Sequence, residues 1–287
     1  MTKIAIKHSG HLGDIIYSLP AALNLMKLNG GICIDLYIPK DKKYLPPQGQ
    51  HHICGDVWIS ESMFNFVYPL LQNIEYISNV YFIDESLIPK NVYNFDSFRI
   101  ESMINLAAGN IIDYYFKSFG LIGGTSDRWL NFRENLVESN LNFDVVIGRS
   151  TRYNNINIDY SILNKFSLKI GFMGTDREYF EFINQFPSLS IERLNLNNAY
   201  EAMLYIFNAG LFIGNQSLFF SIAEGLKVRR LLEVCEICPN VIPSGGVWGQ
   251  FLTTKNLMKL LNQVFNKNNN FDNIPDLYPQ YILGKPI

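Results

Sequence analysis

The chain contains 287 residues, of which 48% are hydrophobic and 17% are charged, and its formal net charge is −2. This apolar content excludes a largely disordered chain, and the scattered lysines and arginines argue against a nucleic-acid binder, which needs clustered phosphate contacts. No apolar run approaches the ~20 residues that cross a bilayer, so no span is expected, although peripheral membrane contact stays open. The first residues lack a signal-peptide pattern, which favours a cytoplasmic protein with reduced cysteines.

The first forty residues alternate between strand and helix patterns. Residues 4–7 predict a strand, residues 10–13 a glycine-bracketed loop and residues 15–27 an apolar helix. Residues 32–38 then predict a second strand. This order indicates a β-α-β unit, whose strands are parallel and whose crossover is right-handed.

The rest of the first half is less regular. Residues 41–56 are mostly polar and contain Pro46 and Pro47 in succession, which predicts a loop. The remaining predicted elements of this half are helices at 63–77, 98–106 and 111–119 and a strand at 80–83. A polar stretch rich in Asn and Glu at 135–142 predicts a boundary, so we divide the chain into domains of residues 1–140 and 141–287.

The second half repeats the alternation more clearly. Its predicted strands are 143–147, 167–172, 189–194, 211–213 and 230–234, and its predicted helices are 179–186, 199–208, 218–226 and 257–265. Together the halves predict an α/β protein with two Rossmann-like, parallel-sheet domains that face a central cleft. Ligands bind beyond the carboxyl ends of parallel strands, so the loops at 10–14 and 214–217 are both expected to face this cleft.

Two segments carry the most specific pattern in the chain. They read HSGHLGDIIYSLPAALNLMK (residues 8–27) and NAYEAMLYIFNAGLFIGNQSLFFSIAEGLKV (residues 198–228). Together they resemble the ADP-heptose:lipopolysaccharide heptosyltransferase family, whose members are glycosyltransferases of GT-B architecture. The first segment has that family's Leu-Gly-Asp, apolar-pair and Ser-x-Pro positions. The second departs from it, with Asn-Gln-Ser-Leu in place of Asn-Asp-Ser-Gly and Ser221 in place of a histidine.

The resemblance implies sugar transfer from a nucleotide-diphosphate donor, with inversion and without a metal or other cofactor. The acceptor would be a glycan, a lipid-linked molecule or a protein. The resemblance places the catalytic base at Asp14, whereas the residue type alone also fits a helix cap, so both interpretations stay open. Gly10 and Gly13 would let a substrate approach the backbone closely. His8 and His11 are alternative bases or polar contacts of the loop.

A donor site is predicted around the second glycine loop. Ser217 opens a helix after a strand, where its hydroxyl and the backbone N–H groups would cradle a phosphate or simply cap the helix. Asn215 and Gln216 would add hydrogen bonds. Because none of these side chains is charged, Arg149 and Arg152 are the predicted cationic partners of the diphosphate, or else solvated loop arginines.

Two further groups of polar residues leave alternatives open. Glu233 or Glu224 would bind the ribose hydroxyls, as a glutamate does in many GT-B enzymes, or would be a surface acid. Cys235 and Cys238 form a lone CxxC pair, which we interpret as buried or idle thiols because a zinc site normally needs further ligands at fixed spacing. The other candidate ligands are His51, His52 and Cys54.

Two other functions remain as alternatives to sugar transfer. One is a nucleotide-sugar 2-epimerase on the same architecture. The other is a nucleotide-sugar-binding protein without transferase activity, which would fit the altered second loop.

Overall fold

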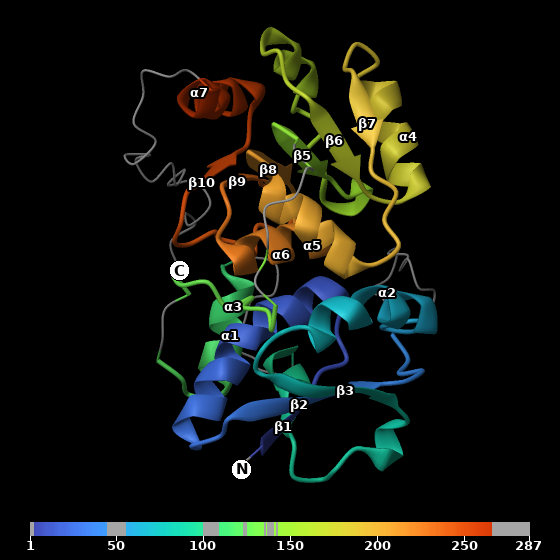
Figure 1. Ribbon diagram of the computed structural model, residues 1–287, viewed down its shortest axis with the longest axis vertical. Helices are drawn as coiled ribbons and strands as arrows, with labels where there is room; N and C mark the ends of the chain where they lie inside the picture. The colour runs from blue at the N-terminus through green and yellow to red at the C-terminus, as the bar shows by residue number, and fades with distance from the viewer. Residues whose placement is uncertain are drawn as a thin grey trace.

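The computed structural model describes residues 3–44, 56–99, 109–122, 125–134, 136, 141 and 143–265. These residues build two parallel sheets, one of four strands and one of six, which lie one above the other with helices between them (Figure 1). The predicted α/β class with two parallel-sheet halves is therefore confirmed. Most of the predicted boundary stretch lies outside the described residues.

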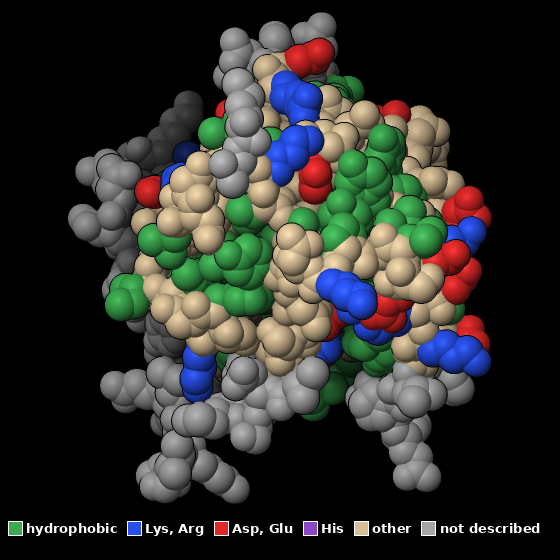
Figure 2. Space-filling model, turned by 90° about the horizontal axis from the view of Figure 1, so that it is seen from below, with side chains coloured by type: hydrophobic (Ala, Val, Ile, Leu, Met, Phe, Trp, Pro, Cys, Tyr) green, Lys and Arg blue, Asp and Glu red, His purple; other side chains and the backbone are tan. Residues whose placement is uncertain are grey.

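The N-terminal sheet has the strand order β3-β2-β1-β4, with all neighbours parallel. Its strands are β1 (Lys3–Lys7), β2 (Cys33–Pro39), β3 (Ile77–Ile83) and β4 (Tyr93–Asn94), and its helices are α1 (Leu12–Leu28), α2 (Glu61–Gln72), α3 (Ile111–Ser118) and the 3-10 turns η1 (Glu85–Leu87) and η2 (Phe95–Arg99). The three α-helices lie on the side of this sheet that faces the C-terminal half (Figure 1). Figure 2 views the molecule from below, where patches of hydrophobic side chains alternate with charged ones.

Several elements of this half differ from the prediction. Helix α1 begins at Leu12 rather than residue 15, because Gly13 continues the helix instead of ending a loop. Pro20 lies buried inside α1 without ending it. The predicted helix at 98–106 meets the 3-10 turn η2, and residues 100–108 lie outside the described part. Strand β4 has only two residues, too short to give a sequence pattern.

The C-terminal sheet has the order β10-β9-β8-β5-β6-β7 and is also fully parallel. Its strands are β5 (Val145–Gly148), β6 (Ile170–Met173), β7 (Ile191–Arg193), β8 (Leu211–Gly214), β9 (Arg230–Glu233) and β10 (Trp248–Phe251). Its helices are α4 (Asp176–Gln185), α5 (Ala199–Asn208), α6 (Leu218–Leu226), α7 (Thr254–Phe265) and the 3-10 turns η3 (Thr151–Tyr153) and η4 (Tyr160–Lys165). Counted from β7, this is the doubly wound order of nucleotide-binding sheets.

Apolar side chains of the two halves meet in one continuous cluster. Helices α1 and α6 pack side by side, with Ile16 and Leu19 from α1 and Phe220 from α6 fully buried. A second cluster fills the other face of the C-terminal sheet, beneath α4 and α7. Burying these apolar surfaces removes them from water and fixes α1 against α6. Among the described helices, none combines the length and apolarity that crossing a bilayer requires.

Candidate active site

Each sheet has one point at which the strand order reverses direction. In the N-terminal sheet it lies between β1 and β4, and in the C-terminal sheet between β5 and β8. Ligands of open parallel sheets bind at such points, beyond the carboxyl ends of the strands. The candidate residues from the sequence follow β1, β5, β8 and β9, so the topology gathers most of them around these two points.

Asp14 lies in the first turn of α1, after the N-cap residue His11. It is therefore not the helix cap, although its negative charge still favours the positive end of the helix dipole. Its Oδ2 accepts a hydrogen bond from Nη2 of Arg99 at 2.9 Å, and its side chain is 21% exposed. The other oxygen, Oδ1, accepts no hydrogen bond from any described residue. Asp14 thus has one oriented and one open carboxylate oxygen.

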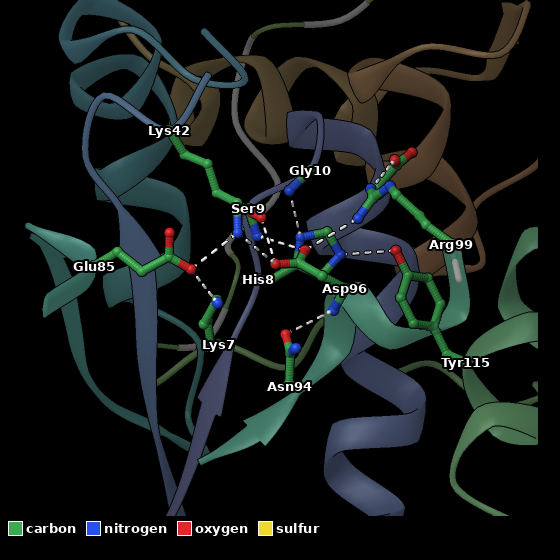
Figure 3. Close-up of polar contacts among 11 residues, drawn as sticks. Lys7, His8, Ser9, Gly10, Lys42, Glu85, Asn94, Asp96, Arg99 and Tyr115 are labelled. Atoms are coloured by element: carbon green, nitrogen blue, oxygen red, sulfur yellow. Dashed lines mark hydrogen bonds and ion pairs between the residues drawn. The ribbon is translucent and has the colours of Figure 1, made fainter. Parts of the chain in front are cut away.

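Arg99 is itself held on several sides by residues of the N-terminal switch point (Figure 3). Its Nη1 donates to Oδ1 of Asp96 at 3.1 Å. Asp96 also accepts hydrogen bonds from the backbone N–H of Ser9, at 2.9 Å, and from the Ser9 hydroxyl. The guanidinium carbon lies 4.7 Å from the centre of the Trp58 ring and 4.4 Å from that of Phe98. Loops after β1 and β4 together therefore orient the Asp14 carboxylate.

Gly10 leaves room for a neighbouring side chain, whereas a Cβ atom at Gly13 would make only ordinary contacts. A Cβ atom on Gly10 would lie 1.9 Å from Nη2 of Arg99, so the guanidinium occupies the space that this glycine leaves. A Cβ atom on Gly13 would lie 3.6 Å from backbone atoms of Ser217 and Leu218. The beginning of α1 therefore meets the beginning of α6, and the two glycine loops lie close together.

His8 is a buried structural residue rather than a base. Its Nδ1 accepts a hydrogen bond from the N–H of Gly10 at 3.0 Å, so Nε2 carries the proton and donates to the Tyr115 hydroxyl at 2.7 Å. Burial, reinforced by the charge of Arg99, lowers the pKa of His8 to about 4. Both ring nitrogens are therefore occupied in a neutral imidazole. The other alternative base, His11, packs its ring against Tyr44 and Trp58.

His8 should make the stability of the protein depend on pH. The unfolded chain takes up a proton near pH 6.5, whereas the folded chain resists it until about pH 4. The stabilisation is therefore complete above pH 6.5 and is lost as the pH falls towards 4, by up to about 1.4 kcal/mol per pH unit. Urea unfolding of the wild type and of His8→Gln should show a smaller acid loss in the variant. Equal losses would contradict the assignment.

Arg149 and Glu233 bind each other inside the C-terminal half. Arg149 Nε donates to Oε2 of Glu233 at 2.7 Å and Nη2 donates to Oε1 at 3.0 Å, with side-chain exposures of 4% and 0%. Glu233 also accepts from the Tyr160 hydroxyl at 2.7 Å and from the backbone N–H of Asn155. The structure therefore gives both residues internal partners, since buried carboxylate and guanidinium groups satisfy each other, and their contacts with a diphosphate and a ribose stay predictions.

Three neighbouring residues organise the loop after β8. Asn215 is fully buried and clamps the backbone of Ser150, accepting from its N–H at 2.9 Å and donating to its carbonyl at 2.7 Å. This clamp joins the loops after β5 and β8 across the switch point. Gln216 donates to Asn240. Ser217 is the N-cap of α6, where its hydroxyl accepts from the N–H of Phe220 at 3.3 Å.

No protein-family model matches the chain, and neither does any curated protein sequence. Solved structures, however, match most of its length. ADP-heptose LPS heptosyltransferase II of E. coli has a TM-score of 0.63 at 11% identity, over 92% of this chain and 98% of that chain. The E. coli heptosyltransferase WaaC with ADP has a TM-score of 0.58 at 11% identity, over 92% and 100% of the two chains. The chain has the fold of these heptosyltransferases.

A third structure, WaaC with ADP-2-deoxy-2-fluoro heptose, matches the same fold with a TM-score of 0.57 at 11% identity, over 91% of this chain and 99% of that chain. The predicted GT-B-like architecture is thus confirmed. At this identity the likeness establishes the heptosyltransferase fold, and the part that each residue plays has to come from its own contacts.

Arg152 is the exposed cation of the C-terminal switch point. It lies in η3, and its guanidinium carbon is 4.4 Å from the centre of the Tyr153 ring. Burial raises the pKa of Tyr153 to about 12, opposed by the charge of Arg152 and supported by that of Asp14. The same turn is therefore within electrostatic reach of the Asp14 carboxylate.

The remaining predicted groups lie in packed surroundings. Glu224 is fully buried and accepts from Lys227 Nζ at 2.6 Å and from Arg230, so it is not exposed to a ribose. Cys235 is buried and Cys238 is half-buried. Within the described ranges, no group of three or more His, Cys, Asp or Glu side chains is arranged to hold a metal ion. His51, His52 and Cys54 lie outside those ranges.

Sequence reasoning missed the residues that orient Asp14. Ser9, Asp96 and Arg99 come from the ends of β1 and β4, and only the heptosyltransferase fold brings the two strands together. The sequence did contain a hint of this site. Asp96 and Arg99 are oppositely charged, lie three residues apart and come just after a short stretch with aromatic residues. An interval of three is equally typical of a helix, and residues 98–106 were predicted to be one.

Proposed function

We propose that this chain is a glycosyltransferase that moves a sugar from a nucleotide-diphosphate donor to a hydroxyl group of a glycan, lipid-linked or protein acceptor. The proposed transfer inverts the anomeric carbon and needs no metal ion. One observation carries the proposal: Asp14 has an oriented carboxylate with an open oxygen, and its neighbour Gly13 packs against the first residues of α6. A proton acceptor and an anion-favouring helix end are thus adjacent at the meeting point of the two halves.

The donor side is proposed at the beginning of α6. The first N–H groups of this helix and the hydroxyl of Ser217 favour a phosphate oxygen, because unpaired donors and the helix dipole both point outward there. Arg152 supplies the positive charge for the diphosphate. Arg149 and Glu233 bind each other, so neither is assigned a direct contact with the donor.

The chemistry uses Asp14 as general base. An acceptor hydroxyl donates its hydrogen bond to Oδ1, and its oxygen attacks the anomeric carbon from the side opposite the nucleotide. The bond to the donor phosphate oxygen breaks as the new glycosidic bond forms, and the hydroxyl proton passes to Asp14. The leaving diphosphate carries the negative charge, which α6 and Arg152 stabilise.

A thermal-shift screen tests the donor class. The candidates are ADP, UDP, GDP, CDP and their common sugar conjugates, with ADP sugars first because a matching structure contains ADP. A ligand at 100 times its dissociation constant stabilises the folded state by about 2.7 kcal/mol, which gives a clear shift. Well-folded protein that responds to none of them would contradict the proposal, and EDTA-sensitive turnover would contradict its metal independence.

Arg152→Ala should weaken nucleoside-diphosphate binding about 10–100-fold, because a hydrogen bond to a charged group contributes roughly 1.5–3 kcal/mol. Titration calorimetry with the diphosphate found in the screen measures this effect. Arg177→Ala is the matched control, since Arg177 is an exposed arginine on α4 paired with Glu181. Equal affinities in both variants would remove Arg152 from the donor site.

A further inference from the structure

The stems of the loop between β2 and α2 form a small antiparallel ladder beside the start of α1. Lys43 and Val57 are bridge partners, the N–H of Tyr44 donates to the carbonyl of Asp56 at 2.7 Å, and the N–H of Trp58 donates to that of Lys42 at 3.0 Å. This pairing fixes the backbone at Tyr44 and Trp58. Their side chains therefore start from a backbone that is paired on both stems.

Three rings form what we call the aromatic wall: His11, Tyr44 and Trp58. The centres of the Tyr44 and Trp58 rings lie 4.3 Å apart in an edge-on arrangement, and His11 lies 5.0 Å from Trp58 and 5.6 Å from Tyr44. Each residue is partly exposed. Tilted aromatic contacts at this spacing stabilise one another and hold the three rings together.

The aromatic wall adjoins the proposed base. His11 is the N-cap of the helix whose first turn contains Asp14. The Arg99 guanidinium connects the two, since its carbon lies 4.7 Å from the centre of the Trp58 ring and its Nη2 lies 2.9 Å from Oδ2 of Asp14. The aromatic wall and the Asp14 carboxylate are thus joined by one bridging side chain, Arg99, at the start of α1.

The charges around the aromatic wall are balanced. Arg99 is paired with Asp14 and Asp96. Lys42 is paired with Glu85 at 2.9 Å and lies 3.7 Å from Asp96, and Lys7 also binds Glu85 (Figure 3).

Lys43 is next to Tyr44 in the ladder, and alternation along an extended chain turns its side chain to the opposite face. The cations near the wall are therefore already neutralised or directed away. A strongly anionic ligand would have to break existing ion pairs to find a partner here.

We propose that the aromatic wall binds a neutral sugar ring of the acceptor, an inference that rests on the proposed transferase function. A pyranose has a face of C–H groups and a rim of hydroxyls. The C–H face packs against the electron-rich faces of aromatic rings, which attract positively polarised hydrogen. A rim hydroxyl then reaches Oδ1 of Asp14. Apolar contact with a few fixed polar groups is the usual composition of a small-molecule site.

The test is binding of the protein to an immobilised panel of neutral oligosaccharides and of their uronic-acid and phosphorylated counterparts. Binding is measured without nucleotide and with the diphosphate that the thermal-shift screen selects. The wild type is expected to retain neutral glycans, Trp58→Ala to bind them at least about tenfold more weakly, and Trp58→Phe to recover part of the loss. Tyr81→Ala is the matched control, because Tyr81 stacks on Tyr37 at the N-terminal sheet, away from the wall.

The outcomes separate this inference from the proposed function. Retention of anionic glycans alone, retention that Trp58→Ala leaves unchanged, or no retention in either condition would overturn the sugar-binding wall. A thermal shift with nucleotide that is equal in the wild type and in Trp58→Ala supports the transferase proposal independently of the wall. If neither protein shows such a shift, the transferase proposal is overturned, while the glycan-binding result still stands. If Trp58→Ala fails to fold, saturation-transfer-difference NMR on the wild type replaces it. Transfer from aromatic protons of the protein to sugar C–H protons supports the wall, and no transfer overturns it.

Discussion

Replacing Glu233 by alanine is expected to lower the free energy of unfolding by about 3–5 kcal/mol, the usual cost of removing one partner from a buried ion pair. The variant leaves the Arg149 guanidinium without its counter-charge in a site that is 4% exposed. The Tyr160 hydroxyl and the backbone N–H of Asn155 lose their acceptor as well. Urea unfolding at neutral pH measures the change.

Two controls for Glu233→Ala show whether the loss of stability comes from leaving a buried charge without its partner. Glu181→Ala breaks the exposed pair with Arg177 and should cost less than about 1 kcal/mol. The double variant Arg149→Met with Glu233→Leu removes both charges and should recover much of the lost stability. A Glu233→Ala protein of normal stability that binds the nucleotide poorly would instead return Glu233 to the ribose contact that the sequence predicted.

The regular elements could be predicted because their patterns are local. Residues 218–226 read as a helix after a glycine loop and form α6 within the same bounds. Strands β1, β5, β6 and β8 were likewise predicted at or near their positions. β10 could not be predicted, since it lies among prolines and glycines and is extended only because it pairs with β9.

For the candidate site, the sequence predicts which loops follow strands, but it does not predict which loops lie side by side in the fold. Ser217 was placed correctly at the start of a helix, and Asp14 lies in the first turn of a helix that begins three residues earlier than predicted. The pairing of Arg149 with Glu233 and of Asp14 with Arg99 depends on strand order, and these partners lie 84 and 85 residues apart. The residues around Asp14 or Arg149 in the sequence do not indicate which distant residue will be the partner in the folded chain.

Asp14→Asn is expected to lower turnover by about 10²–10⁴-fold, the usual contribution of a general base. Asparagine has nearly the same shape, and its carbonyl oxygen can still accept the hydrogen bond from Arg99, so the fold and the charge-independent contacts remain. It cannot take the acceptor proton. Release of the nucleoside diphosphate, followed with the donor that the thermal-shift screen identifies, measures the loss.

Binding and turnover should separate in the Asp14→Asn variant. The donor is proposed at α6 and Arg152, so its affinity should change little while the rate falls. Arg99→Met provides the matched comparison: it leaves the carboxylate in place but removes the guanidinium that orients it, and should slow turnover less than Asp14→Asn does. Full turnover in Asp14→Asn would assign the proton to another group, whereas binding without turnover in the wild type would favour the nucleotide-sugar-binding alternative. Because Oδ1 is the one open oxygen of this carboxylate among the described residues, the variant tests the single atom on which the proposed chemistry depends.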